Sequence, residues 1–337
     1  MLIDDLGAEL EFRVEGPAEE AFQRLGRTED IRFSPDNRKL AIAGYLKNSC
    51  FVFDVAIERN GARPAIRIGD YVEIQSTALK EPHGFDFIDD GTLAVANRAG
   101  RVTIFRLPRP GAAGRVHSLK PARVIRRIGL RQKVLSPGSL CVASVSGRRA
   151  TLYVCNNYAD RITRHDFPRP GSIGLSRNEI MLEKTMAIPD GIAISPDRGR
   201  LAVSNHGTAS VSIFDNTQRL SRESGPIGTL SGVTYPHGLR FTPDGKSLLV
   251  ADAGQPVIAL YHCSAGAWRG DREPVAVARV LDDETYLRGH VNSAEGGPKG
   301  IDLDAAGEVL AVTCEERSLA FFHLPSLFGP AGTRWTN

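Results

Sequence analysis

The sequence contains no long apolar run. No stretch of its 337 residues approaches the roughly 18 apolar residues that a membrane-spanning helix needs. The first ten residues, MLIDDLGAEL, are acidic and do not resemble the positively charged start of a secretory signal peptide. We therefore expect a cytoplasmic protein with no signal peptide and no membrane partner.

Cysteine is scarce and shows no C-x-x-C spacing. The five cysteines, an odd number, lie mostly in apolar, strand-like runs: Cys50, Cys141, Cys155, Cys263 and Cys314. This usage predicts reduced, buried thiols. Three catalytic signatures are also missing: the G-x-S-x-G elbow, the H-E-x-x-H helix and the G-x-x-x-x-G-K phosphate loop. No reaction class is therefore indicated by a short motif.

Glycine and proline are abundant and evenly spread. The chain has 34 Gly and 20 Pro, with 42% hydrophobic and 24% charged residues. Enough apolar side chains are present for a large core, so the chain should be globular. Turn residues distributed along the whole length indicate many short elements, which is typical of an all-β protein.

Six copies of one unit account for most of the chain. They run over residues 30–55, 83–107, 137–167, 189–215, 236–263 and 298–324. Copies two to six open with Pro82, Pro137, Pro189, Pro236 and Pro298, about 54 residues apart on average. Each copy reads as three strands, with a Pro-Asp-Gly type turn after the first. A further β-like run follows five of the copies and supplies a fourth strand.

A four-stranded antiparallel unit repeated six times predicts a six-bladed β-propeller in a single domain, 1–337. The sixth copy lacks a fourth strand, and the amino-terminal run AELEFRVEG (8–16) has no partner. This run is therefore expected to complete the last blade and close the ring. Seven blades remain an alternative, although no seventh copy is found.

One variable position in each blade is expected to ring the central channel. The start of the first strand and the end of the second lie at the same face of an antiparallel blade, away from the Pro-Asp-Gly turns. Around the ring the variable positions are Asp30 (preceded by Glu29), His83, Gly138 followed by Ser139, Asp190, His237 and Lys299. With six blades, Asp30 should face Asp190, and His83 should face His237.

This ring suggests three kinds of site. Asp30, Asp190, His83 and His237 could hold one divalent metal, with oxygen ligands suiting calcium and imidazole favouring zinc or manganese. The same groups could serve as acid and base. A polar ligand pocket without metal is the third reading.

A second group of candidates lies at strand ends and in one long loop. His206 and Asp252, and also Asn157 and Glu315, end second strands at the same face, and Ser139 lies beside the ring. Asn97, Asn156, Asn205 and Glu316 also end second strands, and for most such residues turn chemistry is the favoured reason. The loop 286–300 carries His290, Asn292 and Glu295 and could act as a lid.

Acidic residues are missing from one segment. Residues 91–159 contain no Asp or Glu and thirteen basic residues: Arg98, Arg101, Arg106, Arg109, Arg115, Lys120, Arg123, Arg126, Arg127, Arg131, Lys133, Arg148 and Arg149. The net charge of +3 hides this basic sector. It could attract an acidic protein or support self-association. Nucleic acid is not favoured, because few aromatic residues interleave with the basic ones.

The unit PHGLRFTPDGKSLLVADAG (236–254) resembles the repeats of the NHL, gluconolactonase (regucalcin-like) and bacterial lactonase propellers, and the resemblance extends over all six copies. It implies hydrolysis of sugar lactones with a divalent metal held by Glu, Asn and Asp at the starts of inner strands. Asp190 matches the Asp of that pattern, and Glu29 or Asp30 could match the Glu. The chain has PGS at 137–139 where the Asn is expected, and His83, His237 and Lys299 also depart from the pattern.

Two functions follow as hypotheses. In the first, the propeller binds a small polar or anionic metabolite at the channel mouth and hydrolyses a lactone or ester. His83, His237 and Asp190 would be catalytic, and Lys299 would fix a carboxylate or phosphate. In the second, the protein is a non-catalytic interaction scaffold that uses its rim and the basic sector. The fold alone does not separate them.

Overall fold

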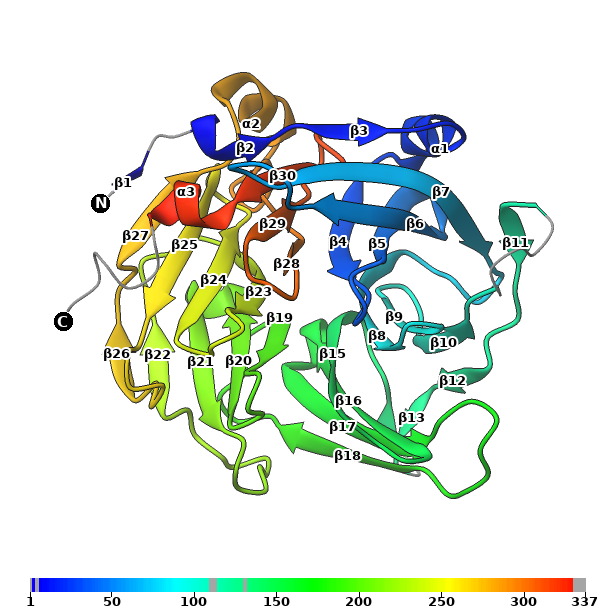
Figure 1. Cartoon of the computed structure of the whole chain (residues 1–337). Helices are drawn as coiled ribbons and strands as arrows, with labels where there is room; N and C mark the ends of the chain where they lie inside the picture. Colours follow the sequence, from blue (N-terminus) through cyan, green and yellow to red (C-terminus); the bar gives the residue numbers. More distant parts are fainter. Residues whose placement is uncertain (1, 4–5, 109–113, 130–131, 330–337) are drawn as a thin grey trace.

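The chain folds into six antiparallel blades arranged in a ring (Figure 1). The first strands of all six blades line a central channel, with Arg32, Asp86 and Cys141 among the lining residues. The computed structural model describes residues 2–3, 6–108, 114–129 and 132–329. The predicted all-β, six-bladed propeller is therefore confirmed, and the seven-blade alternative is not.

Blades one to three each pair their strands in sequence order. Blade one consists of β4 (Thr28–Phe33), β5 (Lys39–Gly44), β6 (Ser49–Glu58) and β7 (Ala65–Gln75). Blade two consists of β8 (Pro82–Asp89), β9 (Thr92–Asn97), β10 (Val102–Arg106) and β12 (Arg123–Ile125). Blade three consists of β15 (Pro137–Ser146), β16 (Arg149–Asn156), β17 (Arg161–Pro168) and β18 (Arg177–Leu182).

Blades four to six complete the ring. Blade four consists of β19 (Pro189–Ile194), β20 (Arg200–Asn205), β21 (Ser210–Asp215) and β22 (Gly228–Leu230). Blade five consists of β23 (Pro236–Phe241), β24 (Ser247–Asp252), β25 (Val257–His262) and β27 (Ala276–Arg279). Blade six consists of β28 (Ile301–Leu303), β29 (Val309–Val312), β30 (Ala320–His323) and the amino-terminal β2 (Glu9–Leu10).

Short elements decorate the ring. The strands are β1 (Leu2–Ile3), β3 (Phe12–Val14), β11 (Val116–Ser118), β13 (Arg127–Ile128), β14 (Gln132–Lys133) and β26 (Gly270–Arg272). The α-helices are α1 (Ala18–Leu25), α2 (Asp283–Gly289) and α3 (Leu324–Phe328). Single 3-10 turns cover Leu6–Ala8, Tyr45–Lys47, Asn157–Ala159 and His206–Thr208. Within the described ranges, no helix is long and apolar enough to cross a membrane.

The amino-terminal segment fastens three consecutive blades. Only β2 joins blade six, where Glu9 pairs with Phe322 and Leu10 with Phe321. Strand β3 continues into blade one and lies parallel to β7, while β1 lies parallel to β27 of blade five. The expectation that all of residues 8–16 complete one blade is therefore wrong in its second half.

The first turn of blades one, four and five has a local cause. A hydroxyl before the proline donates a hydrogen bond to the carboxylate after it, as in Ser34 to Asp36 (2.6 Å) and Thr242 to Asp244 (2.6 Å). The turn then needs a residue with positive φ, which Asn37 (56°) and Gly245 (69°) supply. These turns mark the face opposite the first-strand starts.

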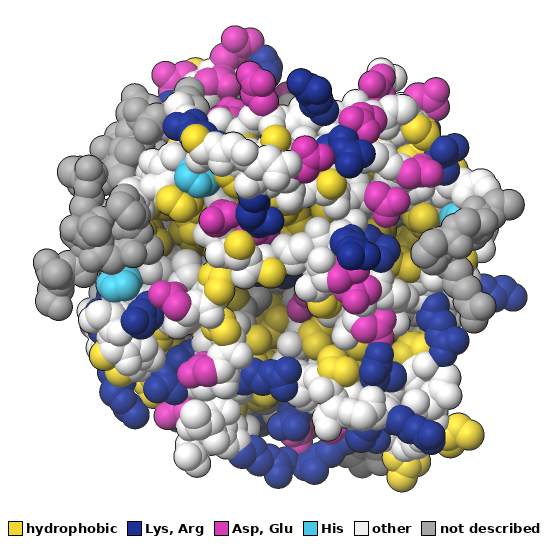
Figure 2. Space-filling view, in the orientation of Figure 1, with side chains coloured by type: hydrophobic (Ala, Val, Ile, Leu, Met, Phe, Trp, Pro, Cys, Tyr) yellow, Lys and Arg dark blue, Asp and Glu magenta, His cyan; other side chains and the backbone are white. Residues whose placement is uncertain are grey.

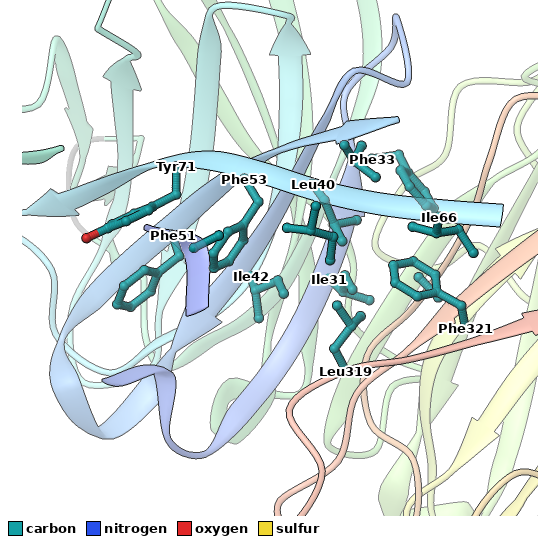
Figure 3. Close-up of a cluster of buried hydrophobic side chains, with 14 of the residues drawn as sticks. Ile31, Phe33, Leu40, Ile42, Phe51, Phe53, Ile66, Tyr71, Leu319 and Phe321 are labelled. Carbon is teal, nitrogen blue, oxygen red and sulfur yellow. The ribbon is translucent and has the colours of Figure 1, made fainter. Parts of the chain in front are cut away.

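The cores lie between neighbouring blades. In one of them, Ile31, Phe33 and Phe53 of blade one pack with Leu319 and Phe321 of blade six (Figure 3). Burying one such side chain contributes about 1.5–3 kcal/mol. All five cysteines are free and buried, as their spacing predicted. The packing of six similar wedges fixes the position of every first strand around the channel.

Charge is unevenly distributed over the molecule. Dark blue Lys and Arg side chains gather along the lower edge in Figure 2, whereas Asp and Glu gather at the top. Nine residues of the basic sector are exposed: Arg101, Arg106, Arg115, Lys120, Arg126, Arg127, Lys133, Arg148 and Arg149. Arg109 and Arg131 lie outside the described residues.

Candidate functional site

In blades one to five, the first strand begins with an irregularity at the channel mouth. In blades two, four and five the opening proline pairs with the end of the second strand, and regular pairing resumes three residues later. Blade one shows the same offset between Thr28 and Ile31. Counting from Thr28, Glu29 is the equivalent of His83. The prediction that Asp30 takes this position is therefore wrong by one residue.

Glu29, His83 and His237 meet at the channel mouth. One donor atom from each lies within 4.8 Å of the others. Glu29 Oε2 is 3.6 Å from His83 Nε2 and 3.9 Å from His237 Nε2. The two imidazole rings lie across from each other, with centroids 5.3 Å apart. All three side chains are buried, so they form a compact set of two nitrogen donors and one carboxylate.

Asp190 lies on the other side of His237. Its Oδ2 is 2.9 Å from His237 Nε2 and 3.6 Å from His206 Nε2. Its Oδ1 accepts a hydrogen bond from the amide of Asn157 and lies 3.4 Å from Arg98 Nη1. Asp190 is 0% exposed. The structure therefore brings together four residues singled out in the sequence, Asp190, His206, Asn157 and His237.

Several buried polar atoms at the mouth have no hydrogen-bond partner among the described residues. They include Asn157 Oδ1 and both ring nitrogens of His206. Glu29 Oε2 and Asp190 Oδ2 have side-chain neighbours: Lys299 Nζ lies 3.2 Å from the first, and His237 Nε2 lies 2.9 Å from the second and hydrogen bonds to it. Because buried polar groups in proteins are nearly always satisfied, the unpaired atoms of Asn157 and His206 stand out at this position.

The electrostatics keep Glu29 and Asp190 charged and His83 and His206 neutral. Burial opposes ionisation of Glu29, but Lys299, His83 and Arg27 outweigh it and hold its pKa below the usual range. Burial likewise opposes ionisation of Asp190, and the neighbouring imidazoles, His237 first, hold its pKa well below the usual range. Burial lowers the pKa of His83 to about 3 and that of His206 to about 4. At neutral pH the site therefore offers two anionic carboxylates and the unprotonated rings of His83 and His206.

Lys299 serves a different purpose from the predicted one. Its Nζ lies 2.5 Å from Glu315 Oε1 and 3.2 Å from Glu29 Oε2, so it is held between two carboxylates. Burial opposes its charge, but Glu29 and Glu315 raise its pKa. Arg27 adds a second cation, 2.5 Å from Glu29 Oε1 and 3.0 Å from Glu295 Oε1. Lys299 and Arg27 therefore balance buried negative charge, and Lys299 is not positioned to fix a substrate anion.

Four residues that were predicted to bind metal or ligand instead contact the nearby backbone or neighbouring strands. Asp30 accepts hydrogen bonds from the backbone N–H groups of Ile31 and Phe85, and it faces Arg32 deeper in the channel. Ser139 takes the glycine position of blade three, with its Cα 2.6 Å from the place that a Cβ on Gly84 would occupy. Neither reaches the donor cluster.

The other two hold loops together. Asp252 accepts hydrogen bonds from the backbone N–H groups of Thr234, Tyr235 and Gly254. His290 Nδ1 lies 2.7 Å from the backbone oxygen of Glu295. Both residues therefore fix the backbone around the mouth, and the predictions that they bind ligand lose their geometric support.

The sequence left one residue of the site unassigned and another undecided. Arg98 was noted only as one charge of the basic sector, and Glu29 was named beside Asp30 as one of two possible matches to the metal-binding Glu of the lactonase pattern. Alignment of strand pairs, with Thr28 in the place of the proline, would have identified Glu29. Arg98 directly follows the end of β9, just as Asn157 and His206 directly follow the ends of β16 and β20. A search for polar residues at the ends of second strands would therefore have found it.

Comparisons with known proteins place the fold. No protein-family model matches the chain. No curated protein matches it. A solved structure provisionally described as a gluconolactonase has 14% identity and a TM-score of 0.57, covering 89% of this chain and 91% of its own. Another, from Bacteroides uniformis and provisionally described as a 6-phosphogluconolactonase, has 13% identity and a TM-score of 0.54, covering 84% and 77%. The chain is thus a six-bladed β-propeller whose fold is similar to that of lactonase-type propellers, as its repeats predicted.

Proposed function

We propose that the protein is a metal-dependent hydrolase of small polar lactones or esters, acting at the channel mouth. The observation that carries this proposal is the buried cluster of Glu29, His83 and His237, whose donor atoms lie within 4.8 Å of one another, with Asp190 Oδ2 2.9 Å from His237 Nε2. Solved structures of similar fold are provisionally described as lactonases, which supports the proposal at the level of the fold.

The donor set fits a divalent ion. Glu29, His83 and His237 provide a carboxylate and two imidazoles, the combination found in hydrolytic zinc sites. Two donors bound to one ion at about 2.2 Å lie at most about 4.4 Å apart. The separations of 3.6 and 3.9 Å between Glu29 and the two imidazoles are below this limit. Imidazole donors favour zinc or manganese over calcium, which prefers six to eight oxygens. A divalent ion held here would polarise a carbonyl group and make a water more acidic.

Asp190 is suited to orient an attacking water. It is ionised, buried and next to the donor cluster. Because its pKa is held well below the usual range, it would position a water by accepting a hydrogen bond and would not take the proton itself. His206 Nε2, 3.6 Å from Asp190 Oδ2, could accept the proton of this water and pass it to the leaving oxygen.

Arg98 is the cation best placed to meet a substrate oxygen. Its side chain is 20% exposed, contacts Asp190 with one terminal nitrogen and lies over the ring of Tyr158. Lys299 and Arg27 are occupied by Glu29, Glu295 and Glu315. A polar or anionic substrate would therefore be oriented by Arg98, and the proposal assigns Lys299 to charge balance.

Metal analysis and lactone turnover test the proposal together. We expect the purified protein to hold about one zinc or manganese ion per chain, and the variant His83→Ala with His237→Ala to lose it. Asp190→Asn should lower lactone turnover by about 10²- to 10⁴-fold. His290→Gln, which changes a histidine outside the cluster, is the matched control and should keep turnover. A metal-free protein whose ester and lactone turnover is indifferent to Asp190→Asn would rule the proposal out.

A further inference from the structure

The loop between β17 and β18 carries two aliphatic side chains that are almost entirely in solvent. Ile173 is 103% exposed and Leu175 is 89% exposed, the two highest values among the large exposed hydrophobic residues of the described chain. Isolated exposed apolar residues are common on protein surfaces. Two within three positions of one projecting loop are not isolated, and they need an explanation.

Three arginine side chains contact this loop from the adjoining strands of blades two and three. Arg149 donates a hydrogen bond to the backbone oxygen of Leu175 (3.1 Å), and Arg123 donates to the hydroxyl of Ser176 (3.1 Å). Gly171 has φ +88°, and a Cβ there would lie 2.3 Å from a terminal nitrogen of Arg106. The backbone is therefore bound to the blade edge while the two aliphatic side chains point away from it.

The surroundings of the loop are positively charged. We call Ile173, Leu175 and the six arginines around them the loop patch; the arginines are Arg106, Arg123, Arg148, Arg149, Arg169 and Arg177. Three of these pair with a carboxylate each, Arg149 with Asp166, Arg169 with Asp89, and Arg177 with Glu179. In Figure 2 yellow side chains stand beside dark blue ones at the lower right edge, where Figure 1 places this loop. Positive charge remains in excess around the apolar tip.

The loop lies on the face opposite the candidate site. In blade three, Asn156 pairs with Arg161 at the mouth end, whereas Arg149 pairs with Pro168 at the other end. The loop follows Pro168, so it leaves the disc from the face of the Pro-Asp-Gly turns. A surface bound through the loop patch would leave the channel mouth open to solvent.

We propose that the loop patch docks the protein onto anionic lipid bilayers, with Ile173 and Leu175 inserted among the lipids and the arginines on the headgroups. A projecting tip with spread positive charge suits a fluid anionic surface. A protein partner would call for a flatter apolar patch, with aromatic residues at its centre. The absence of a long apolar run, from which no membrane partner was expected, excludes a spanning helix but not this peripheral contact.

Vesicle co-sedimentation of the full chain tests the proposal. The chain should sediment with phosphatidylcholine vesicles that contain phosphatidylserine, and not with phosphatidylcholine alone, and added salt should release it. Ile173→Ser with Leu175→Ser should weaken binding at least about tenfold, because both apolar contacts are lost. Leu287→Ser with Val291→Ser is the matched control, since these residues are 66% and 76% exposed on another part of the molecule, and it should bind like the wild type.

Other outcomes decide against the proposal. Failure of the wild-type chain to bind vesicles with phosphatidylserine would overturn it, as would binding that the Ile173 and Leu175 replacements leave unchanged. Capture on polyglutamate beads without vesicle binding would point to an acidic protein partner instead, which also overturns it. Asp190→Asn should bind vesicles like the wild type, so this test is independent of the hydrolase proposal. Circular dichroism and unchanged melting temperatures would show that each variant is folded.

Discussion

A missing side chain shapes the candidate site as much as those present. Gly138 occupies the ring position of blade three, and a Cβ there would lie 2.1 Å from Asn157 Oδ1 and 2.3 Å from Asp190 Oδ1. The space above blade three is therefore filled by Asn157, which comes from the end of the second strand. The side-chain amide beside Asp190 therefore comes from Asn157, because Gly138 in the first strand of blade three has no side chain to provide one.

Replacing Gly138 should disturb the site more than the fold. We expect Gly138→Ala to displace Asn157 and Asp190 and to lower lactone turnover by about tenfold or more, because small misplacements of reacting groups are costly. The melting temperature should fall modestly. Gly69→Ala is the control, since a Cβ at Gly69 would have nothing within 4 Å. Equal turnover in the two variants would contradict this account.

His206 should make the metal-free protein sensitive to acid. Burial lowers its pKa to about 4, whereas an unfolded histidine titrates near 6.5. Between these values the unfolded chain binds more protons than the folded one, so stability falls as the pH is lowered. In the wild type this group should remove about 1–2 kcal/mol of the free energy of unfolding between pH 7 and pH 5. Urea unfolding of His206→Gln after chelation should show a loss smaller by that amount. An identical pH dependence in both proteins would show that His206 is not held neutral.

The sequence predicted which kinds of residue meet at the mouth, but not all of their partners. His83, His237 and Asp190 were identified because their blades share one frame. Asp30 was misplaced because blade one lacks the opening proline that fixes the register, and Thr28 stands there instead. The ion pairs of Lys299 with Glu29 and Glu315 join residues that are 270 and 16 positions apart in the sequence, so no local pattern could show them.

At the scale of the strands, the glycine of each Pro-x-Gly start is a packing contact between blades. A Cβ on Gly191 would lie 1.8 Å from the backbone oxygen of His237, and a Cβ on Gly238 would lie 2.5 Å from that of Lys299. Neither glycine has a positive φ. The glycine therefore repeats because the first strand of the next blade passes directly over it, and this contact also sets the positions of the ring residues.

Gly191→Ala should accordingly destabilise the propeller. The backbone at His237 would have to move, and such overpacking costs about 1–3 kcal/mol. The free energy of unfolding, measured in urea, should fall by that amount, and metal content should fall with it because His237 shifts. Gly225→Ala, at a glycine with nothing within 4 Å of a Cβ, should change neither quantity. A fully stable Gly191→Ala protein would show that the blades can separate at no cost.

The number and order of the strands could be predicted, because the repeated pattern is local in the sequence. The sharing of residues 8–16 between two blades could not be predicted. Residues 8–16 alternate in a way that suits one strand, but pairing with β30 ends after Leu10, and β3 pairs with β7 of the next blade. Which neighbour a short strand joins depends on the gap between blades six and one, and that gap is a property of the closed ring.

At the scale of the whole molecule, the ring is closed by contacts of the first fourteen residues with three blades. Strands β1, β2 and β3 pair with β27, β30 and β7 in turn. Ala8 and Leu10 are buried, and Glu9 forms an ion pair with Arg317 of blade six. Without these strands, β30 would present an unpaired edge, which is a template for association with another chain.

Deletion of residues 1–16 should therefore open the ring. We expect a loss of several kcal/mol of stability, a less cooperative urea transition with a smaller denaturant slope, and oligomers in size-exclusion chromatography. The variant Glu11→Ala, which changes an exposed residue between β2 and β3, is the control for effects of altered charge in this segment. A truncated chain that stays monomeric and unfolds with the slope of the wild type would mean that the contacts between blade cores, such as Phe321 with Ile31, hold the ring closed by themselves.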